Sequence, residues 1–199
     1  MTTRQTPIWR SYALPATLTL LSIVIAAVGD TLQLPLRYDR DAIMGGQLWR
    51  LVSAHLTHLG WSHLGLNLAG LAMVFVFFGS LLTQRHWLTI TLVCAVGTSV
   101  GLFVFNPDVK WYVGLSGVLH GLFIAGGIAD LKTRRNEALV FLGLLVLKLG
   151  WEQTMGPMPG SESAAGGPVL VDAHLYGAVT ALTWMLAVAI FQKVRAARR

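Results

Sequence analysis

The sequence predicts an all-α polytopic membrane protein, a bundle of six transmembrane helices with both termini on the cytoplasmic side. Hydrophobic residues make up 54% of the 199 residues and charged residues only 12%, about half the charged share of an ordinary soluble domain. The apolar residues gather in six runs separated by polar segments. The basic residues concentrate in every second segment, which is typical of cytoplasmic loops.

The charge of the chain indicates a membrane partner and excludes a nucleic-acid partner. The net charge is +6, but the basic residues stand in short clusters between apolar runs, which makes the lipid bilayer the expected partner. The single cysteine, Cys94, lies in an apolar run, so an internal disulfide and a cysteine metal site are both excluded. We expect no cofactor and no metal.

Each apolar run is long enough to predict a span, or nearly so. The first lacks a convincing small-residue cleavage site and is expected to be a retained helix and not a signal peptide. The fourth is short and rich in glycine, which predicts a central helix packed on all sides. Lys148, near the end of the fifth, is expected to snorkel to the interface. The expected spans are residues 11–29, 62–82, 86–105, 113–128, 138–151 and 169–191.

Two segments between the spans stand out. Residues 30–61 mix charged with large apolar side chains, including Trp49 and Trp61, which predicts a long structured loop at the outer membrane interface. Residues 153–168 are rich in glycine, proline and serine and are expected to form a flexible loop on the outer face. No repeat or second domain is apparent, so residues 1–199 are interpreted as one membrane domain.

The positive charges set the orientation. With a cytoplasmic N-terminus, ten of the fifteen lysines and arginines lie inside. The inside set is Arg4, Arg10, Arg85, Lys132, Arg134, Arg135, Lys193, Arg195, Arg198 and Arg199. The second, fourth and sixth spans then all begin at the outer face.

This orientation brings four polar residues to one depth. His63 and Asn67 lie near the start of the second span, Ser116 near that of the fourth and His174 near that of the sixth. At a rise of about 1.5 Å per residue, all four lie in the outer third of the membrane. Ionisable groups inside a membrane are costly and are candidates for function.

The four residues have the chemistry of acyl transfer. Ser116 is a candidate nucleophile, and a histidine is the base that such a hydroxyl needs. Asn67, His63 and the Ser116 amide can donate hydrogen bonds to an oxyanion. Gly114 and Gly117 let the backbone turn sharply at the serine and let a substrate strand approach.

Several alternatives stay open at this point. A single Gly-x-Ser-Gly at the start of a membrane helix usually indicates helix packing, and only the conjunction at one depth favours catalysis. The chain could instead bind transmembrane segments without cleaving them, or hold haem or a metal through His63, His120 and His174. A transporter is disfavoured because the polar groups form one layer. His55, His58 and His86 are interpreted as structural or interfacial.

The motifs resemble the rhomboid family of intramembrane serine proteases over residues 47–190. Trp49, Arg50 and His58, followed by His63 and Asn67, are similar to its Trp-Arg, His and His-x-x-x-Asn pattern. Gly114, Ser116 and Gly117 match its Gly-x-Ser-Gly motif, and His174 with Gly177 its last-helix motif. The resemblance implies a Ser116–His174 dyad without a carboxylate, an oxyanion hole of His63, Asn67 and the Ser116 amide, and membrane-anchored protein substrates. It also places Trp49 and Arg50 in a loop embedded in the outer leaflet.

The chain departs from the family pattern at two positions. Many rhomboids carry a tyrosine that stacks on the catalytic histidine where this chain has His120, which adds a second candidate base one turn from Ser116. Ala181 stands where a glycine is frequent.

The regions around Ser116 and His174 look most like the rhombosortase branch. That likeness implies an enzyme of the bacterial inner membrane, with its active site toward the periplasm. It would process exported proteins that carry a Gly-Gly C-terminal anchor. A general rhomboid protease with other substrates is the alternative.

Overall fold

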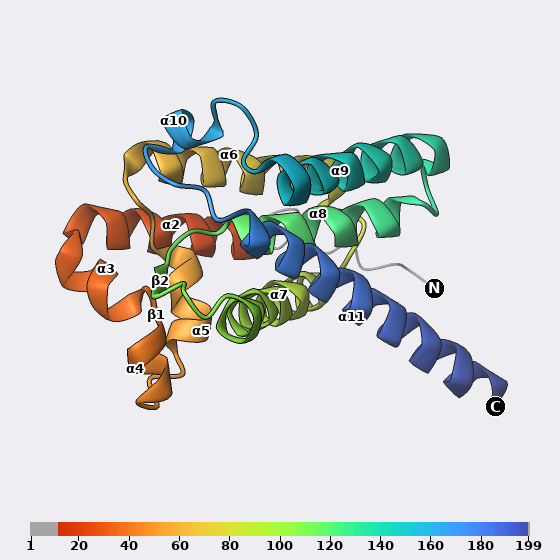
Figure 1. Cartoon of the computed structure of the whole chain (residues 1–199). Coiled ribbons are helices and arrows are strands. Elements are labelled where there is room, and N and C mark those ends of the chain that lie inside the picture. Colours follow the sequence, from red (N-terminus) through yellow and green to blue (C-terminus); the bar gives the residue numbers. More distant parts are fainter. Residues whose placement is uncertain (1–11, 199) are drawn as a thin grey trace.

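A computed structural model describes residues 12–198 of the chain (Figure 1). Ser11, where the first span was expected to begin, and the basic residues Arg4, Arg10 and Arg199 lie outside the described residues. The larger helices are α2 (Ala13–Val28), α6 (Trp61–Phe78), α7 (Gln84–Phe105), α8 (Ser116–Asp130), α9 (Arg135–Met155) and α11 (Val171–Ala197). The predicted helical membrane bundle is confirmed.

The helices differ in how fully they meet the requirements for crossing a membrane. Within the described part of the chain, α6, α7, α9 and α11 are each long and apolar enough to span. Helix α2 qualifies only together with α3 (Asp30–Leu36), from which it is bent by 119°. Helix α8 has 15 residues, about 22 Å of helix against the roughly 30 Å of a hydrocarbon core.

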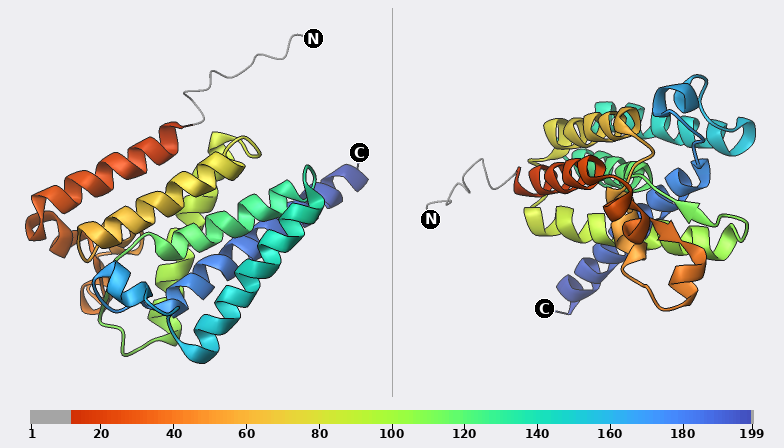
Figure 2. Two further views of the ribbon diagram at one scale, coloured as in Figure 1. Left: turned by 90° about the horizontal axis from the view of Figure 1, so that it is seen from above. Right: turned by 90° about the vertical axis from the view of Figure 1, so that its left-hand side faces the viewer.

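Helix α8 lies at the centre of the bundle, as its glycines predict. It contacts α6, α7, α9 and α11, and Figure 2 shows it between α6 and α9 with α11 beside it. A Cβ added at Gly126 would lie 2.6 Å from the Phe78 ring, and one at Gly127 would lie 2.7 Å from Leu142. The small residues therefore let neighbouring helices approach the α8 backbone.

The segment 30–61 is folded, as expected. After α3 come strand β1 (Tyr38–Asp39), the short helices α4 (Arg40–Met44) and α5 (Arg50–Ser53), and a 3₁₀ turn, η1 (Ala54–Leu56). Its buried arginines are satisfied by backbone carbonyls: Arg50 donates to Leu34 and Arg37, and Arg40 donates to four carbonyls, of Leu102, Phe103, Asn106 and Val109. The Arg40 bonds fix this segment against the end of α7, and the Arg50 bonds hold the segment together.

A two-stranded antiparallel sheet joins this segment to the chain just before α8. Strand β1 pairs with β2 (Trp111–Tyr112), with Tyr38 opposite Tyr112 and Asp39 opposite Trp111. Tyr38 and Tyr112 are both buried. The pairing positions the backbone that leads into Ser116.

The fifth span and the segment after it differ from expectation. Helix α9 continues to Met155, four residues beyond the predicted end at Trp151, and residues 161–165 form a short helix, α10 (Ser161–Ala165). Ser62 Oγ donates to the Ala165 carbonyl over 3.3 Å, which attaches α10 to α6. Gly156, Gly160 and Gly166 have positive φ values, and the Gly/Pro/Ser-rich composition of residues 153–168 did not indicate the short helix between the last two.

Candidate active site

Ser116 and His174 meet between α8 and α11. The Ser116 Oγ lies 3.0 Å from the His174 Nε2. Ser116 is the first residue of α8 and His174 is in the first turn of α11. A hydroxyl and an imidazole at this distance can exchange a proton, with the imidazole nitrogen accepting.

Two glycines allow the close approach of these helices. A Cβ on Gly177 of α11 would collide with the Gly117 carbonyl oxygen of α8. A Cβ on Gly117 would lie 2.7 Å from the Ala173 carbonyl oxygen. The backbones are therefore in direct contact, which fixes the distance between the two side chains that precede these glycines by one and three residues.

Gly114 shapes the turn before the serine. Its φ is +120°, a conformation that favours glycine, and a Cβ there would lie 2.8 Å from the His63 ring. The Tyr112 hydroxyl donates to the Gly114 carbonyl over 2.9 Å, and the buried His55 ring lies 3.2 Å from the same oxygen. Burial raises the pKa of Tyr112 to about 12, so this phenol remains a donor at neutral pH.

His63 and Asn67 border the same site from α6. The Leu59 amide donates to the His63 Nδ1 over 3.3 Å. In the neutral ring the proton must then be on Nε2, which leaves that nitrogen as a donor. One N–H of the Asn67 amide donates to the His63 carbonyl over 2.9 Å, and the second is not committed to that bond. The Ser116 amide is at a helix N-terminus, where amides have no intrahelical partner.

His120 stacks on His174. The ring centroids are 4.1 Å apart and the ring planes differ by 19°. The His120 Nδ1 donates to the Ser116 carbonyl over 2.7 Å. Within the described part of the chain, no hydrogen bond joins the His120 ring to the Ser116 hydroxyl. His120 thus occupies the stacking position that the sequence comparison assigned to a tyrosine.

Glu152 and Lys148, both on α9, complete the site, and sequence reasoning did not identify Glu152 at all. One carboxylate oxygen of Glu152, Oε2, lies 3.0 Å from the His174 Nδ1 and 2.7 Å from the Lys148 Nζ. The expectation that Lys148 snorkels to the interface is wrong. Its Nζ points inward and also lies 2.6 Å from the His120 Nε2. The available signal was the i,i+4 spacing of opposite charges on an apolar span.

The implied dyad without a carboxylate is therefore incomplete as a description of the geometry. The Glu152 side chain is 2% exposed, and a carboxylate is buried only where it is paired. The partners of its oxygen Oε2 are the two groups named above.

Three of these side chains could also ligate a metal. Among the described residues, His120, Glu152 and His174 each offer a ligand atom, all within 4.8 Å of one another. His63 is not part of this group. The Lys148 ammonium already lies between the three, 3.3 Å from the His174 Nδ1, so a metal ion would have to displace it.

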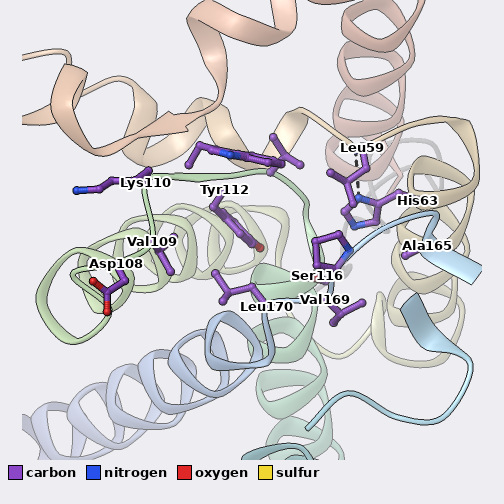
Figure 3. A pocket seen from close by; sticks show the side chains of 13 residues that line it. Leu59, His63, Asp108, Val109, Lys110, Tyr112, Ser116, Ala165, Val169 and Leu170 are labelled. Carbon is purple, nitrogen blue, oxygen red and sulfur yellow. Dashed lines mark hydrogen bonds between the residues drawn. The ribbon is translucent and has the colours of Figure 1, made fainter. Parts of the chain in front are cut away.

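Ser116 opens onto two cavities. One, of about 390 Å³, is lined by His63, Tyr112, Ser116 and Leu170 among others (Figure 3). Figure 3 shows Ser116 near His63, with the Leu59–His63 hydrogen bond dashed. The other, of about 280 Å³, reaches Asn67, His120, Lys148 and His174. A peptide that occupied both cavities would pass the Ser116 hydroxyl.

The remaining histidines and Trp49 lie outside the group of side chains that meet at Ser116. Trp49 donates from its ring to the Pro35 carbonyl over 3.3 Å and is 55% exposed. His58 is buried with its ring edge-on to His63, 5.2 Å between centroids. Burial lowers the pKa of His58 to about 3, so its ring is neutral at physiological pH. His86 is exposed, and Thr83, the N-cap of α7, accepts a hydrogen bond from its amide.

Comparison with known proteins agrees with this architecture. The family model described as a Rhomboid domain matches residues 45–191, which includes every site residue named above. No curated protein matches the chain.

Proposed function

Because the chain belongs to the rhomboid family of intramembrane serine proteases, we propose that it cleaves membrane-anchored proteins with Ser116 as nucleophile and His174 as general base. The observation that carries the proposal is the 3.0 Å contact between the Ser116 Oγ and the His174 Nε2. The second nitrogen of the same ring faces a carboxylate. This arrangement favours a base on the nitrogen that faces serine.

The reaction proceeds through an acyl-enzyme. The Ser116 Oγ attacks a peptide carbonyl while His174 Nε2 takes the hydroxyl proton. The C–N bond then breaks, and the imidazolium gives its proton to the leaving amine. A water molecule, deprotonated by His174, attacks the ester carbonyl, and the Ser116 oxygen leaves as a hydroxyl.

The oxyanion of each tetrahedral intermediate needs donors on the side of Ser116 opposite His174. His63 Nε2, the free N–H of Asn67 and the Ser116 amide are those donors in this proposal. The close approach of the His63 ring to Gly114 supports it, because a side chain at position 114 would push the ring away.

The proposed substrates are exported bacterial proteins with a Gly-Gly sequence next to a C-terminal membrane anchor. The likeness of this chain to the rhombosortase branch supports that class. So does the cost of presenting a peptide to Ser116, since a transmembrane helix must unwind and glycine lowers that cost by about 1 kcal/mol per residue. A general rhomboid specificity is the alternative.

Orientation follows from the basic turn between α8 and α9. Lys132, Arg134 and Arg135 lie at the opposite end of α8 from Ser116. Because basic residues favour the cytoplasmic side, they support the proposal that Ser116 faces the periplasm across an inner membrane. Alkaline phosphatase fusions are expected to be active after residue 110 and inactive after residue 133. The reverse pattern would overturn this orientation.

A fluorophosphonate probe tests the nucleophile and base without a known substrate. The Ser116 Oγ displaces fluoride from phosphorus, so labelling reports an activated serine. Wild-type protein is expected to be labelled, and Ser116→Ala and His174→Ala are expected to lose labelling. Persistent labelling of Ser116→Ala would refute the assignment, and unlabelled wild-type protein would favour a non-catalytic binder of transmembrane segments.

A pair of reporter proteins tests the substrate class. One carries a Gly-Gly sequence before its C-terminal anchor, and the other has Leu-Leu at the same place. Preferential cleavage of the first by wild-type protein, absent from Ser116→Ala, supports the Gly-Gly class. Equal cleavage of both supports general rhomboid specificity.

A further inference from the structure

Two oppositely charged side chains of helix α9 point into the site. Lys148 and Glu152 are one turn apart, and their Nζ and Oε2 atoms are 2.7 Å apart. Counted from the end of α9 at Met155, Lys148 lies about 10 Å along the helix and Glu152 about 5 Å. Charges at such positions in an apolar span are retained for a specific contact.

Resting on the proposed function, we propose that Glu152 is a positioning residue for His174 and that Lys148 is the fixed cation that keeps Glu152 ionised. Ser116, His174 and Glu152 then form a serine–histidine–carboxylate chain, and the Lys148 ammonium balances the charge of the carboxylate. Two residues on α9 thereby join the Ser–His pair formed by α8 and α11.

The shorter contact at the His174 Nδ1 favours one assignment of protons. The Glu152 oxygen lies 3.0 Å from this nitrogen and the Lys148 Nζ lies 3.3 Å from it. A carboxylate accepts only, so the bond to Glu152 requires the proton on Nδ1. Its Nε2 is then unprotonated and can accept from Ser116. Glu152 therefore selects the ring tautomer that can act as a base.

The partners of His120 determine its tautomer in the same way. His120 Nδ1 faces the Ser116 carbonyl, which accepts only, so this nitrogen carries the proton. The His120 Nε2 is left as an acceptor, and the Lys148 ammonium donates to it over 2.6 Å. With its lone pair engaged by a cation, His120 cannot serve as the base for Ser116.

The charges around His174 nearly cancel. The Glu152 oxygen lies 3.0 Å from the His174 Nδ1 and the Lys148 Nζ lies 3.3 Å from it. Interaction energy between charges scales inversely with distance, so the two act on the ring with similar strength and opposite sign. The main effect of Glu152 and Lys148 together is therefore to orient the His174 ring and select its tautomer, because their electric fields at the ring largely cancel.

This balance makes the two charges separable by experiment. In Glu152→Gln the unpaired Lys148 cation disfavours a charged His174, so the acid side of the pH–rate profile moves to lower pH. In Lys148→Gln the unpaired Glu152 carboxylate favours a charged His174, so the acid side of the profile moves to higher pH. The double variant has neither charge and is expected to return toward the wild-type position. The other titratable groups nearby, His63 on α6, His120 on α8 and Asp172 and Tyr176 on α11, are the same in all variants.

The experiment measures the rate of fluorophosphonate labelling between pH 5 and pH 9 in purified protein. We expect Glu152→Gln to label about 100-fold more slowly than wild type at pH 7, compared with roughly 10⁴-fold for loss of the carboxylate from a Ser-His-Asp triad. Glu152→Asp, which keeps the carboxylate, is expected to recover part of the rate. Glu137→Gln makes the same change at an exposed position of α9 and should label like wild type.

The thermal midpoint of each variant in detergent distinguishes loss of fold from loss of positioning. If Glu152→Gln does not fold, Lys148→Gln and the double variant still test the proposal. The acid limb of the pH–rate profile must lie at higher pH in Lys148→Gln than in the double variant. Labelling of a folded Glu152→Gln at the wild-type rate, or pH profiles that coincide in all variants, would overturn the positioning role alone. Wild-type protein not labelled at Ser116 would overturn the proposed function as well.

Discussion

The His120 and His174 rings stack with centroids 4.1 Å apart, and only His174 contacts the Ser116 hydroxyl. His120 instead bridges the Ser116 carbonyl and the Lys148 ammonium. The two histidines therefore have different tasks, although the sequence offers both as bases.

Replacing His120 by tyrosine is expected to preserve most of the reactivity of Ser116. The ring stack remains, and aromatic stacking contributes about 0.5–1.5 kcal/mol, so His120→Ala should label with fluorophosphonate about 10-fold more slowly and His120→Tyr within a few-fold of wild type. Abolished labelling in His120→Tyr, with the thermal midpoint unchanged, would show that His120 is the base.

The contact between Gly117 and Gly177 predicts a severe effect of one methyl group. Gly177→Ala puts a Cβ against the Gly117 carbonyl, so α8 and α11 must separate. Overpacking of this kind costs about 1–3 kcal/mol, and the separation also lengthens the Ser116–His174 distance. We expect a lower thermal midpoint and little or no labelling.

Gly143→Ala is the matched control for that substitution. Gly143 lies on α9 with nothing within 4 Å of an added Cβ. Alanine is the better helix former by up to about 1 kcal/mol in water, so the variant should be at least as stable as wild type. A Gly177→Ala protein as stable and reactive as Gly143→Ala would contradict the close helix contact.

Removing an oxyanion donor should slow the reaction without unfolding the protein. Loss of one such donor costs roughly 10²–10³-fold in rate. Asn67→Ala, measured by reporter cleavage, is expected to lower kcat by that amount with KM little changed. Gly65→Ala, on the same helix and with nothing within 4 Å of the added Cβ, is the control. An equal loss in both variants would indicate a general effect on α6 instead.

The buried His58 ring is expected to make the free energy of unfolding decrease at acid pH. Its folded pKa of about 3 is below the ordinary value of 6.5, so the unfolded chain binds a proton first as the pH falls. The stability from the neutral, buried ring is complete above pH 6.5 and decreases below it, by about 2–3 kcal/mol at pH 4.5. Thermal midpoints measured from pH 7.5 to pH 4.5 test this.

Two variants identify the source of that acid sensitivity. His58→Gln cannot titrate and should lose a large part of the pH dependence, whatever its stability at pH 7.5. His86→Gln removes an exposed histidine and should keep all of it. An unaltered pH dependence in His58→Gln would assign the sensitivity to another group.

Removing Lys148 is expected to create a metal site. His120, Glu152 and His174 supply two imidazoles and a carboxylate, a ligand set that suits zinc. With the ammonium gone, Zn²⁺ should raise the thermal midpoint of Lys148→Ala, and EDTA should reverse the rise. Wild-type protein and the Lys148→Ala, Glu152→Gln double variant should respond much less. An equal response in all three proteins would place the zinc elsewhere.

The sequence was sufficient to predict the larger helices and four of the central polar residues. Apolar runs and basic clusters report membrane spans directly, because transfer into lipid depends on composition. Depth alone placed His63, Asn67, Ser116 and His174 in one layer, and all four line one cavity, of which His63 and Ser116 also line a second. The glycines of α8 predicted its central position for the same kind of reason.

Glu152 could not be placed from the sequence because its role depends on where α9 ends. The polar residues that follow Trp151 suggested a loop, yet the helix continues to Met155 and turns Glu152 and Lys148 inward. Which face of a helix is buried is decided by its neighbours, and α9 has an exposed apolar surface over much of its length. The inward direction of Lys148 follows from partners on α8 and α11 that no local pattern contains.

The pairing of Tyr38 with Tyr112 links the fate of the nucleophile to a segment more than seventy residues earlier in the chain. Arg40, directly after that strand, is fixed by four carbonyls around the end of α7. A genetic screen for inactive protein should therefore recover substitutions at Arg40 alongside those at Ser116. Such inactivating substitutions would cluster in two separate regions of the gene, around the codons for Arg40 and Ser116, and would give the same phenotype.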